Sequence, residues 1–298
     1  MKFGIIGLGR MGKNLAKNAI DHNHQVYVYN RTYEKSKEID NYGGYATESI
    51  EKLVNSLDDK KVIWLMLPAG DVTNKHIDIL KEHLKQGDII INGANNHYKE
   101  TIKKSKELKK LEINLMDIGV SGGIEGARNG ASMMIGGSYE AYEHIKPLID
   151  DLCVKNGYDY FGKSGSGHFV KMVHNGVEYG MMEAIGEGFE VLEKSEFELD
   201  YEKVSKVWSN GSVIRGWLME LLNQALKNKD ITEFSEEIGQ SGEGLWTLQE
   251  ALKLKVSTPV ITDAVYRRFD SKNKNETSNR VVQALRYMFG GHDDKNKI

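Results

Sequence analysis

A glycine-rich turn directly after the first apolar run limits the folds open to this chain more than any other feature. Residues 3–6 are apolar, and the next six read Gly-Leu-Gly-Arg-Met-Gly. The first glycine of such a turn allows the tight bend, the second lets a pyrophosphate approach the backbone, and the third lets the following helix pack on the strand. The helix N-terminus then binds the anion. A chance glycine-rich turn is the alternative, but its place favours a dinucleotide site made by Gly7, Leu8, Gly9, Arg10, Met11 and Gly12.

Short apolar runs alternate with amphipathic stretches over roughly the first 120 residues, as parallel strands do with their crossover helices. This alternation predicts a doubly wound α/β Rossmann sheet with helices on both faces. A later apolar run, Ala131–Ile135, is expected to extend the sheet. The other expected strands are Phe3–Ile6, Gln25–Tyr29, Val62–Leu67, Asp88–Ile91 and Asn114–Ile118, with helices at Lys13–Asp21 and Val72–Leu84.

Strand patterns end near Gly162, and the remainder indicates long helices with breaks at 209–211, 238–244 and 269–279. The first of these helices runs without proline over Ser166–Glu193. We therefore expect a dinucleotide-binding domain at 1–162 and an all-α domain for substrate binding and oligomerisation at 163–298.

Charge and hydropathy exclude several classes of partner. Basic and acidic residues number 40 and 43 and are well mixed, so no broad electrostatic field attracts nucleic acid or a membrane surface. No apolar run approaches the roughly 18 residues of a membrane span, and the N-terminal run is too short for a signal peptide. With a single cysteine, Cys153, these features predict a cytoplasmic protein.

The end of the second expected strand indicates which dinucleotide binds. A site for NAD usually has an acidic residue there, about 20 residues after the glycine turn, but this chain has Asn30, Arg31 and Thr32. An arginine and a hydroxyl can hydrogen-bond a 2′-phosphate, and no carboxylate repels it. The sequence favours NADP, with NAD possible; Arg31 as a solvated surface charge is the alternative.

Four polar residues form one stripe on the long helix. Lys171, His174, Asn175 and Glu178 are spaced i, i+3, i+4 and i+7, and apolar residues flank them. Apolar flanks predict burial, and a buried lysine can lose its proton near neutral pH and act as a general base. An ordinary surface stripe, with Lys171 and Glu178 too far apart to pair, is an equal alternative from spacing alone.

Together these segments resemble the 6-phosphogluconate dehydrogenases, in particular their short bacterial form, within the β-hydroxyacid dehydrogenase superfamily. The resemblance covers the whole chain and implies oxidative decarboxylation of 6-phosphogluconate to ribulose 5-phosphate and CO2 with reduction of NADP or NAD, without a metal. The motifs that carry it are Gly7–Gly12, Leu67–Gly70, Asn92–Tyr98, Gly119–Arg128, the Lys171 helix, Gly242–Thr247 and Phe289–His292.

The resemblance implies roles for individual residues. Lys171 corresponds to the base that takes the substrate hydroxyl proton, and Glu178 to the acid that protonates C1 after CO2 leaves. Groups that hold the sugar acid correspond to Asn95, Ser121, Gly122, Gly123, His174 and Asn175. The substrate phosphate is expected at Tyr179, Thr247, Arg268 (or Arg267, one position earlier), Arg286 and His292, and the cofactor also at Leu67, Pro68, Ala69 and Asn95.

The chain departs from the family pattern at several positions. Asn92, Ala94 and Asn96 replace an aspartate, a glycine and a serine, and Leu245 stands where the family has a basic residue near the phosphate. Loss of that charge predicts weaker phosphate binding or another substrate.

The resemblance also bears on assembly and on competing functions. Common family members have a duplicated helical half and this chain has one, so we expect a homodimer or homotetramer in which Arg286 and His292 of the C-terminal tail complete the partner's site. One alternative is a β-hydroxyacid dehydrogenase that does not decarboxylate, against which His174 argues, because those relatives have an asparagine there. A non-catalytic dinucleotide-binding module is the second alternative, and the intact Lys171 argues against it.

Overall fold

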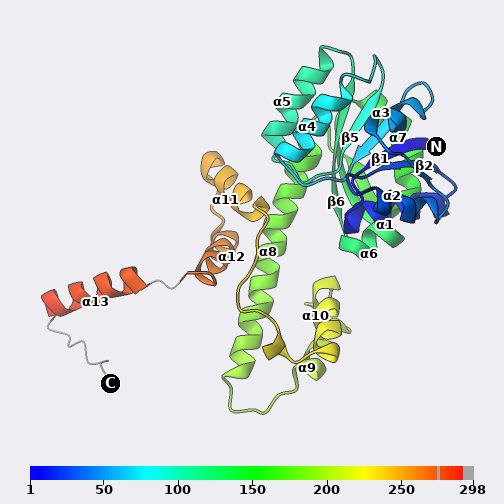
Figure 1. Cartoon of the computed structure of the whole chain (residues 1–298). Helices are drawn as coiled ribbons and strands as arrows, with labels where there is room; N and C mark the ends of the chain where they lie inside the picture. The colour runs from blue at the N-terminus through cyan, green and yellow to red at the C-terminus, as the bar shows by residue number, and fades with distance from the viewer. Residues whose placement is uncertain (274–275, 291–298) are drawn as a thin grey trace. The chain divides into compact units, whose positions relative to one another are not determined.

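Residues 1–273 and 276–290 are described by the computed structural model, and they form two compact units (Figure 1). The first unit is Met1–Asn175 and the second begins at Gly176. The long helix α8, Ser166–Glu193, runs through the boundary.

The first unit contains one mixed sheet whose eight described strands have the order β3-β2-β1-β4-β5-β6-β7-β8. β1 to β6 pair in parallel, β7 is antiparallel to β6, and β8 is parallel to β7. All carboxyl ends of β1 to β6 therefore lie at one edge. The strands are β1 Lys2–Ile6, β2 Gln25–Tyr29, β3 Tyr45–Ala46, β4 Val62–Leu65, β5 Ile89–Asn92, β6 Asn114–Ser121, β7 Ala131–Gly136 and β8 Cys153–Tyr160.

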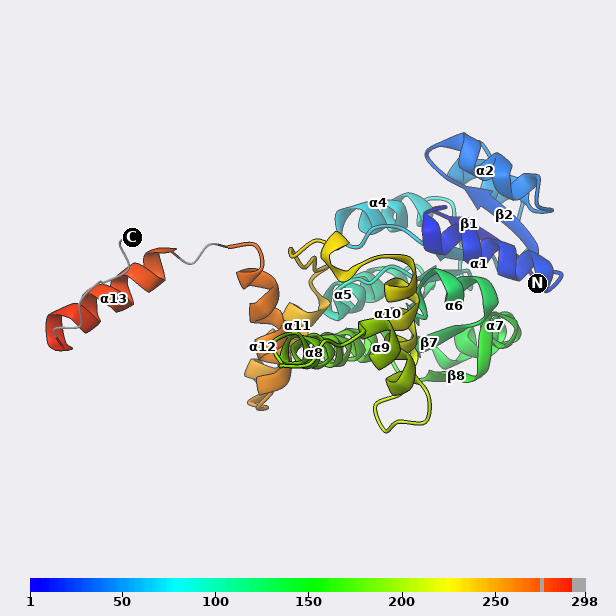
Figure 2. The same cartoon turned by 90° about the horizontal axis from the view of Figure 1, so that it is seen from below.

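Helices cover both faces of this sheet because its central strands are apolar on both sides. Phe3 and Ile5 belong to a core with residues of α1 and α7, whereas Ile6 points to the opposite core with α3, α4 and α5. Helix α6 packs on α1, and Figure 2 shows α4 and α5 away from α6 and α7. The helices are α1 Arg10–Asp21, α2 Tyr33–Asp40, α3 Ile50–Asn55, α4 Asp71–Leu80, α5 Tyr98–Lys109, α6 Gly123–Asn129 and α7 Tyr139–Leu152.

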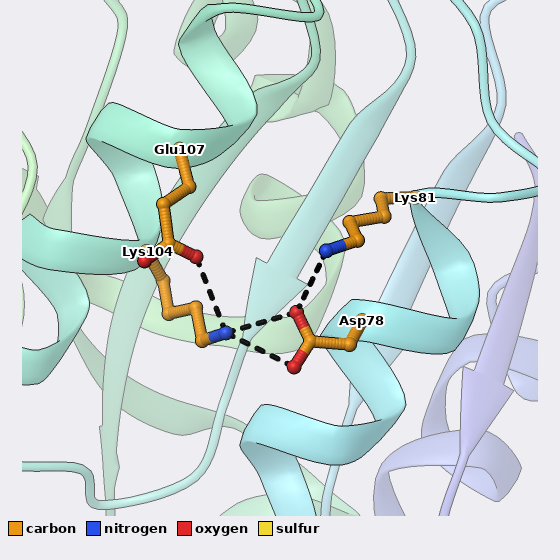
Figure 3. Close-up of polar contacts among 4 residues, drawn as sticks. All are labelled: Asp78, Lys81, Lys104 and Glu107. Atoms are coloured by element: carbon orange, nitrogen blue, oxygen red, sulfur yellow. Dashed lines mark hydrogen bonds and ion pairs between the residues drawn. The ribbon is translucent and has the colours of Figure 1, made fainter.

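An ion-pair network joins α4 to α5 (Figure 3). The ammonium of Lys104 lies 2.9 and 3.1 Å from the two carboxylate oxygens of Asp78 and 3.3 Å from Glu107. Lys81 lies 3.3 Å from the same Asp78 carboxylate. Burial lowers the pKa of Lys104, but its bonds to Asp78 and Glu107 raise it above the usual value overall. The network fixes α5, which begins just after Asn95.

The second unit is helical. After Gly176, α8 continues to Glu193, and the side chain of Asn223 on α10 donates to the hydroxyl of Ser205 on α9 at 3.0 Å. No helix within the described ranges is long and apolar enough to cross a membrane. The other elements are α9 Tyr201–Ser209, α10 Trp217–Asn228, the 3-10 turn η1 Ile231–Glu233, α11 Glu243–Leu254, α12 Pro259–Asp270 and α13 Glu276–Gly290. The predicted fold class, a Rossmann domain followed by an all-α domain, is confirmed.

Candidate functional site

Five of the predicted loops lie at the carboxyl edge of the parallel strands. The glycine turn follows β1, residues 30–32 follow β2, residues 67–69 follow β4, Asn95 follows β5, and 121–123 end β6. Ligands of open α/β sheets bind outside this edge. The topology thus places these candidate residues at one edge of the sheet.

Contacts within the glycine turn explain why it needs glycine. Gly7 has φ +100°, and a Cβ there would lie 2.4 Å from the Met66 carbonyl oxygen. A Cβ on Gly12 would lie 2.1 Å from the Gly7 carbonyl oxygen. At Gly9, by contrast, an added Cβ would meet nothing within 4 Å. The turn is closed against the protein and open over Gly9, at the N-terminus of α1, where the first turn has no acidic residue. This arrangement fits a pyrophosphate.

Asn30 ties the glycine turn to the end of β2. Its side-chain oxygen accepts from the Leu8 N–H at 2.9 Å, and its amide donates to the Thr32 carbonyl at 3.0 Å. Arg31 and Thr32 are exposed. Asn30 therefore shapes the turn, and the exposed pair beside it offers the donors for a 2′-phosphate.

The loop after β5 is closed by the side chain of Asn92, the last residue of the strand. The Asn92 side chain accepts from the Ala94 N–H at 3.1 Å, and both residues are buried. A Cβ on Gly93 would lie 2.4 Å from Nε1 of Trp64. The amide oxygen of Asn92 accepts this bond as a carboxylate oxygen there could, so the departures at Asn92 and Ala94 leave a closed loop that leads to the half-buried Asn95.

The start of α8 is fixed on the sheet by a buried carboxylate. Asp117, on β6, accepts from the backbone N–H groups of Gly165 at 2.8 Å and His168 at 3.0 Å. The backbone also approaches closely, since a Cβ on Gly119 would lie 2.3 Å from Cβ of Lys171. The contact with the sheet therefore fixes the position of the Lys171 Cβ atom.

Lys171 contacts a polar cluster within the first unit. Lys171 is 6% exposed and Asn175 9%, so the surface-stripe alternative does not describe them. Nδ1 of His174 lies 2.9 Å from Oδ1 of Asn175 and 3.4 Å from Nζ of Lys171, and Nε2 lies 3.3 Å from Oγ of Ser121. Since a carbonyl oxygen only accepts, Nδ1 carries the hydrogen in this arrangement and Nε2 accepts from Ser121.

A second cluster lies in the helical unit and contains three predicted phosphate residues. The guanidinium of Arg268 lies 3.8 Å from the ring centroid of Tyr179 and donates to the Ala264 carbonyl at 2.7 Å. Nearby, Thr247 contacts Gly176, where a Cβ would lie 2.7 Å from the Thr247 methyl group. The structure brings Tyr179, Thr247 and Arg268 to neighbouring positions on α8, α11 and α12.

Burial separates the two candidate arginines, although both lie within 4 Å of the Glu183 carboxylate. Arg268 is buried against Tyr179, whereas Arg267 is exposed and lies 3.6 Å from Glu183 and 3.8 Å from Glu190. Burial raises the pKa of Glu183, which Arg267 and Arg268 only partly offset. Arg268 is therefore the arginine that belongs to the cluster.

The remaining predicted residues pack beside the second cluster, lie elsewhere or lie outside the described residues. Leu245 packs against the small apolar cluster of Tyr179, Ala264 and Val265. Glu178 is half-buried, Arg286 is exposed on α13, and His292 lies outside the described residues. No group of three or more His, Cys, Asp or Glu side chains within the described chain is arranged to hold a metal ion.

Sequence reasoning missed Asp117 and His168. Both are almost fully buried, and His168 bonds to Asn92 and Thr101 as well as to Asp117. A signal was present for Asp117, because it is the one charged residue in the otherwise apolar run 115–120. Its partners lie about 50 residues away along the chain, which no local pattern indicates.

Family models match almost the whole chain. Residues 2–160 match the NAD binding domain of 6-phosphogluconate dehydrogenase, and residues 167–296 match the 6-phosphogluconate dehydrogenase C-terminal domain. The chain belongs to the 6-phosphogluconate dehydrogenase family. The resemblance inferred from the motifs is thereby confirmed.

Individual family members align over the full chain. It is 46% identical over 298 residues to YqeC of Bacillus subtilis (strain 168), whose name places it in the same family, and all of both chains is covered. It is 39% identical to the NAD(+)-dependent, decarboxylating 6-phosphogluconate dehydrogenase of Haloferax volcanii, covering 100% of this chain and 99% of that one. Among solved structures, Plasmodium falciparum 6-phosphogluconate dehydrogenase aligns with a TM-score of 0.83 at 31% identity, covering 100% of this chain and 67% of that one.

Proposed function

We propose that this chain catalyses oxidative decarboxylation of 6-phosphogluconate to ribulose 5-phosphate and CO2 with reduction of NADP. The observation that carries the proposal is the buried Lys171 in contact with His174, which is bonded in turn to Ser121 and Asn175. The Nδ1 hydrogen of His174 is directed to Asn175, and the Lys171 amine lies beside the ring, buried among the groups proposed to hold the sugar acid. This geometry supports Lys171 as a general base.

The reaction needs little beyond positioning and proton transfer. Lys171 takes the proton of the C3 hydroxyl while the C3 hydrogen leaves as hydride, for which a bound nicotinamide would supply the acceptor. The resulting ketone is β to the carboxylate, so the C1–C2 electrons move toward it as CO2 leaves. Glu178, two turns after Lys171 on α8, then protonates the C1 carbon of the enediol. His174, Asn175, Ser121 and Asn95 hold the sugar acid.

The open space over Gly9 and the N-terminus of α1 are the proposed place of the pyrophosphate, with residues 67–69 beside it. NADP is the proposed cofactor because Arg31 and Thr32 are exposed where an NAD site has a carboxylate. Named relatives include both an NAD(+)-dependent enzyme and one solved with NADP+. Replacing Arg31 with aspartate is expected to weaken NADP far more than NAD.

Arg268, Tyr179 and Thr247 are the proposed phosphate site, together with Arg286 and His292 from a partner chain. Nε of Arg268 is buried and has no hydrogen-bond partner in the described chain, which supports a bound anion there. Leu245 supports a second candidate, an unphosphorylated 3-hydroxy acid. Its side chain packs among apolar residues and leaves this cluster without the family's extra positive charge.

We propose that the functional division falls at 162/163 and that the protein works in the cytoplasm as a homodimer or homotetramer. Exposed apolar residues of α13 support assembly through the helical domain; they are Val281, Val282, Leu285 and Met288. Sedimentation of the wild type and of Leu285→Glu tests the proposed assembly. A smaller species for Leu285→Glu is expected, and a monomeric wild type would contradict it.

The main experiment measures dinucleotide reduction and CO2 release by purified protein with 6-phosphogluconate, gluconate and 3-hydroxyisobutyrate, each with NADP and with NAD. We expect reduction and CO2 with 6-phosphogluconate and NADP, lost by at least about a hundredfold in Lys171→Met. The exposed Lys103→Met, on α5, is the matched control and should keep the wild-type rate.

Two outcomes would overturn the proposal. Turnover of an unphosphorylated acid without CO2 release would assign the second candidate and make Leu245 the first residue to test. Binding of NADP without turnover of any acid would assign a non-catalytic module.

A further inference from the structure

A buried histidine one turn before Lys171 has no role in the steps above, yet every polar group of His168 is bonded. It is 2% exposed. Nε2 lies 3.1 Å from the Asn92 carbonyl oxygen, and Nδ1 lies 2.7 Å from the Thr101 hydroxyl. Because a carbonyl only accepts, Nε2 donates to Asn92, and Nδ1 accepts from Thr101. One neutral tautomer satisfies both bonds, and burial lowers the pKa of His168, which agrees with a neutral ring.

The two ends of this contact belong to different parts of the candidate site. Asn92 is the last residue of β5, and its side chain closes the turn to Ala94 that leads to Asn95. His168 lies on α8, three residues before Lys171. The imidazole therefore connects the loop of Asn95 to the helix of Lys171.

Asp117 prevents the helix end from moving relative to the sheet. Its carboxylate accepts the N–H groups of Gly165 and His168, where the helix dipole favours negative charge. Gly167 has no room for a side chain, since its Cβ would lie 2.4 Å from the Asp117 carbonyl oxygen. Because the helix is fixed in this way, the bond from His168 to the Asn92 carbonyl holds the loop at a set distance from the helix.

We propose that His168 is a positioning residue for the reaction, which sets the distance between Asn95 and Lys171 through its bond to the Asn92 carbonyl. The inference rests on the proposed roles of Asn95 and Lys171. A histidine that only fills the core would affect activity in proportion to the stability it supplies. A positioning histidine affects kcat through one of its two bonds.

Two amide variants separate the bonds. In His168→Gln the amide nitrogen stands near the place of Nε2 and donates to Asn92, but the acceptor for Thr101 is lost. In His168→Asn the side-chain oxygen stands near Nδ1 and accepts from Thr101, but nothing reaches Asn92. We expect His168→Gln to keep kcat within about threefold and His168→Asn to lose roughly tenfold to a hundredfold, since small misplacements have effects of this size.

Thr101→Val is the matched control, because it removes the second bond and leaves the Asn92 bond. It should lose stability and keep kcat within about threefold, as His168→Gln does. The Kd for NADPH should stay within about threefold of wild type in His168→Gln and Thr101→Val, since neither displaces the loop of Asn95 or touches the glycine turn. Equal loss of kcat in the Gln and Asn variants, or wild-type kcat in both, would overturn the inference.

Hydrogen exchange gives a readout that needs no substrate. Amides of residues 93–97 should exchange faster in His168→Asn than in His168→Gln and the wild type. If the wild type fails to oxidise 6-phosphogluconate, the proposed function fails, but the exchange comparison still decides the inference. If neither histidine variant folds, Thr101→Val replaces them: wild-type exchange at 93–97 with kcat within about threefold supports the inference, and faster exchange with a larger loss of kcat overturns it.

Discussion

Gly9 and Gly12 show how two glycines of one motif are required for different reasons. Gly12 has no space for a side chain, because its Cβ would lie 2.1 Å from the Gly7 carbonyl oxygen. Gly9 has open space and an ordinary extended backbone, with φ −66° and ψ −175°. The fold therefore needs glycine at Gly12, whereas only a ligand needs it at Gly9.

Substituting each with alanine should separate folding from binding. Gly12→Ala is expected to lower the free energy of unfolding by about 1–3 kcal/mol through overpacking. Gly9→Ala should leave it unchanged or raise it by roughly 0.5 kcal/mol, while a methyl group in the cofactor's place raises the NADPH Kd at least about tenfold. Urea unfolding and fluorescence titration measure the two quantities. Unchanged NADPH affinity in a folded Gly9→Ala would place the pyrophosphate elsewhere.

Sequence patterns predicted the strongly apolar strands and the long helix α8. Gln25–Tyr29 and Ser166–Glu193 coincide with β2 and α8. Val62–Leu67 was too long, because β4 ends at Leu65 before the turn at Pro68. β3 and β8 were missed, since β3 has two residues and β8 is polar and has no buried residue.

The parts of the candidate site whose residues lie close together in the sequence could be predicted. The glycine turn and the Lys171 helix are such cases, and their residues lie where the pattern indicates. The contacts of Asp117 and His168 could not be predicted, because they join β5, β6, α5 and α8 across 48 to 76 residues of sequence. Their geometry exists only once the sheet has formed.

The network between α4 and α5 predicts a measurable contribution to stability. Lys104 is 16% exposed and holds both Asp78 and Glu107, so Lys104→Met should lower the free energy of unfolding by about 1 kcal/mol, less at high salt. Lys85→Met is the matched control, because the Lys85 and Asp59 side chains are 62% and 90% exposed and their pair should contribute much less to the free energy of unfolding. Equal losses of unfolding free energy in the two variants would show that the partial burial of Lys104 adds nothing to the stability.

The first unit as a whole should lose stability in mild acid because burial or partial burial disfavours the charged form of several of its histidines. Burial is the main cause that lowers the pKa of His24, His144 and His168 below the usual 6.5. Nearby positive charge also lowers the pKa of His24 and His144, through the N-terminal ammonium and Lys60 respectively.

Between the lowered folded-state pKa and 6.5, the unfolded chain binds more protons than the folded chain, so stability rises with pH across this window. It is fully present above about 6.5 and is lost as pH falls through the folded-state values, at up to about 1.4 kcal/mol per pH unit for each group. Urea unfolding between pH 5 and 7.5 tests this above the range in which carboxylates titrate. His144→Gln removes one of the groups and should flatten the slope, whereas a wild-type stability that is constant from pH 5 to 7 would mean that folding does not lower the pKa values of these rings.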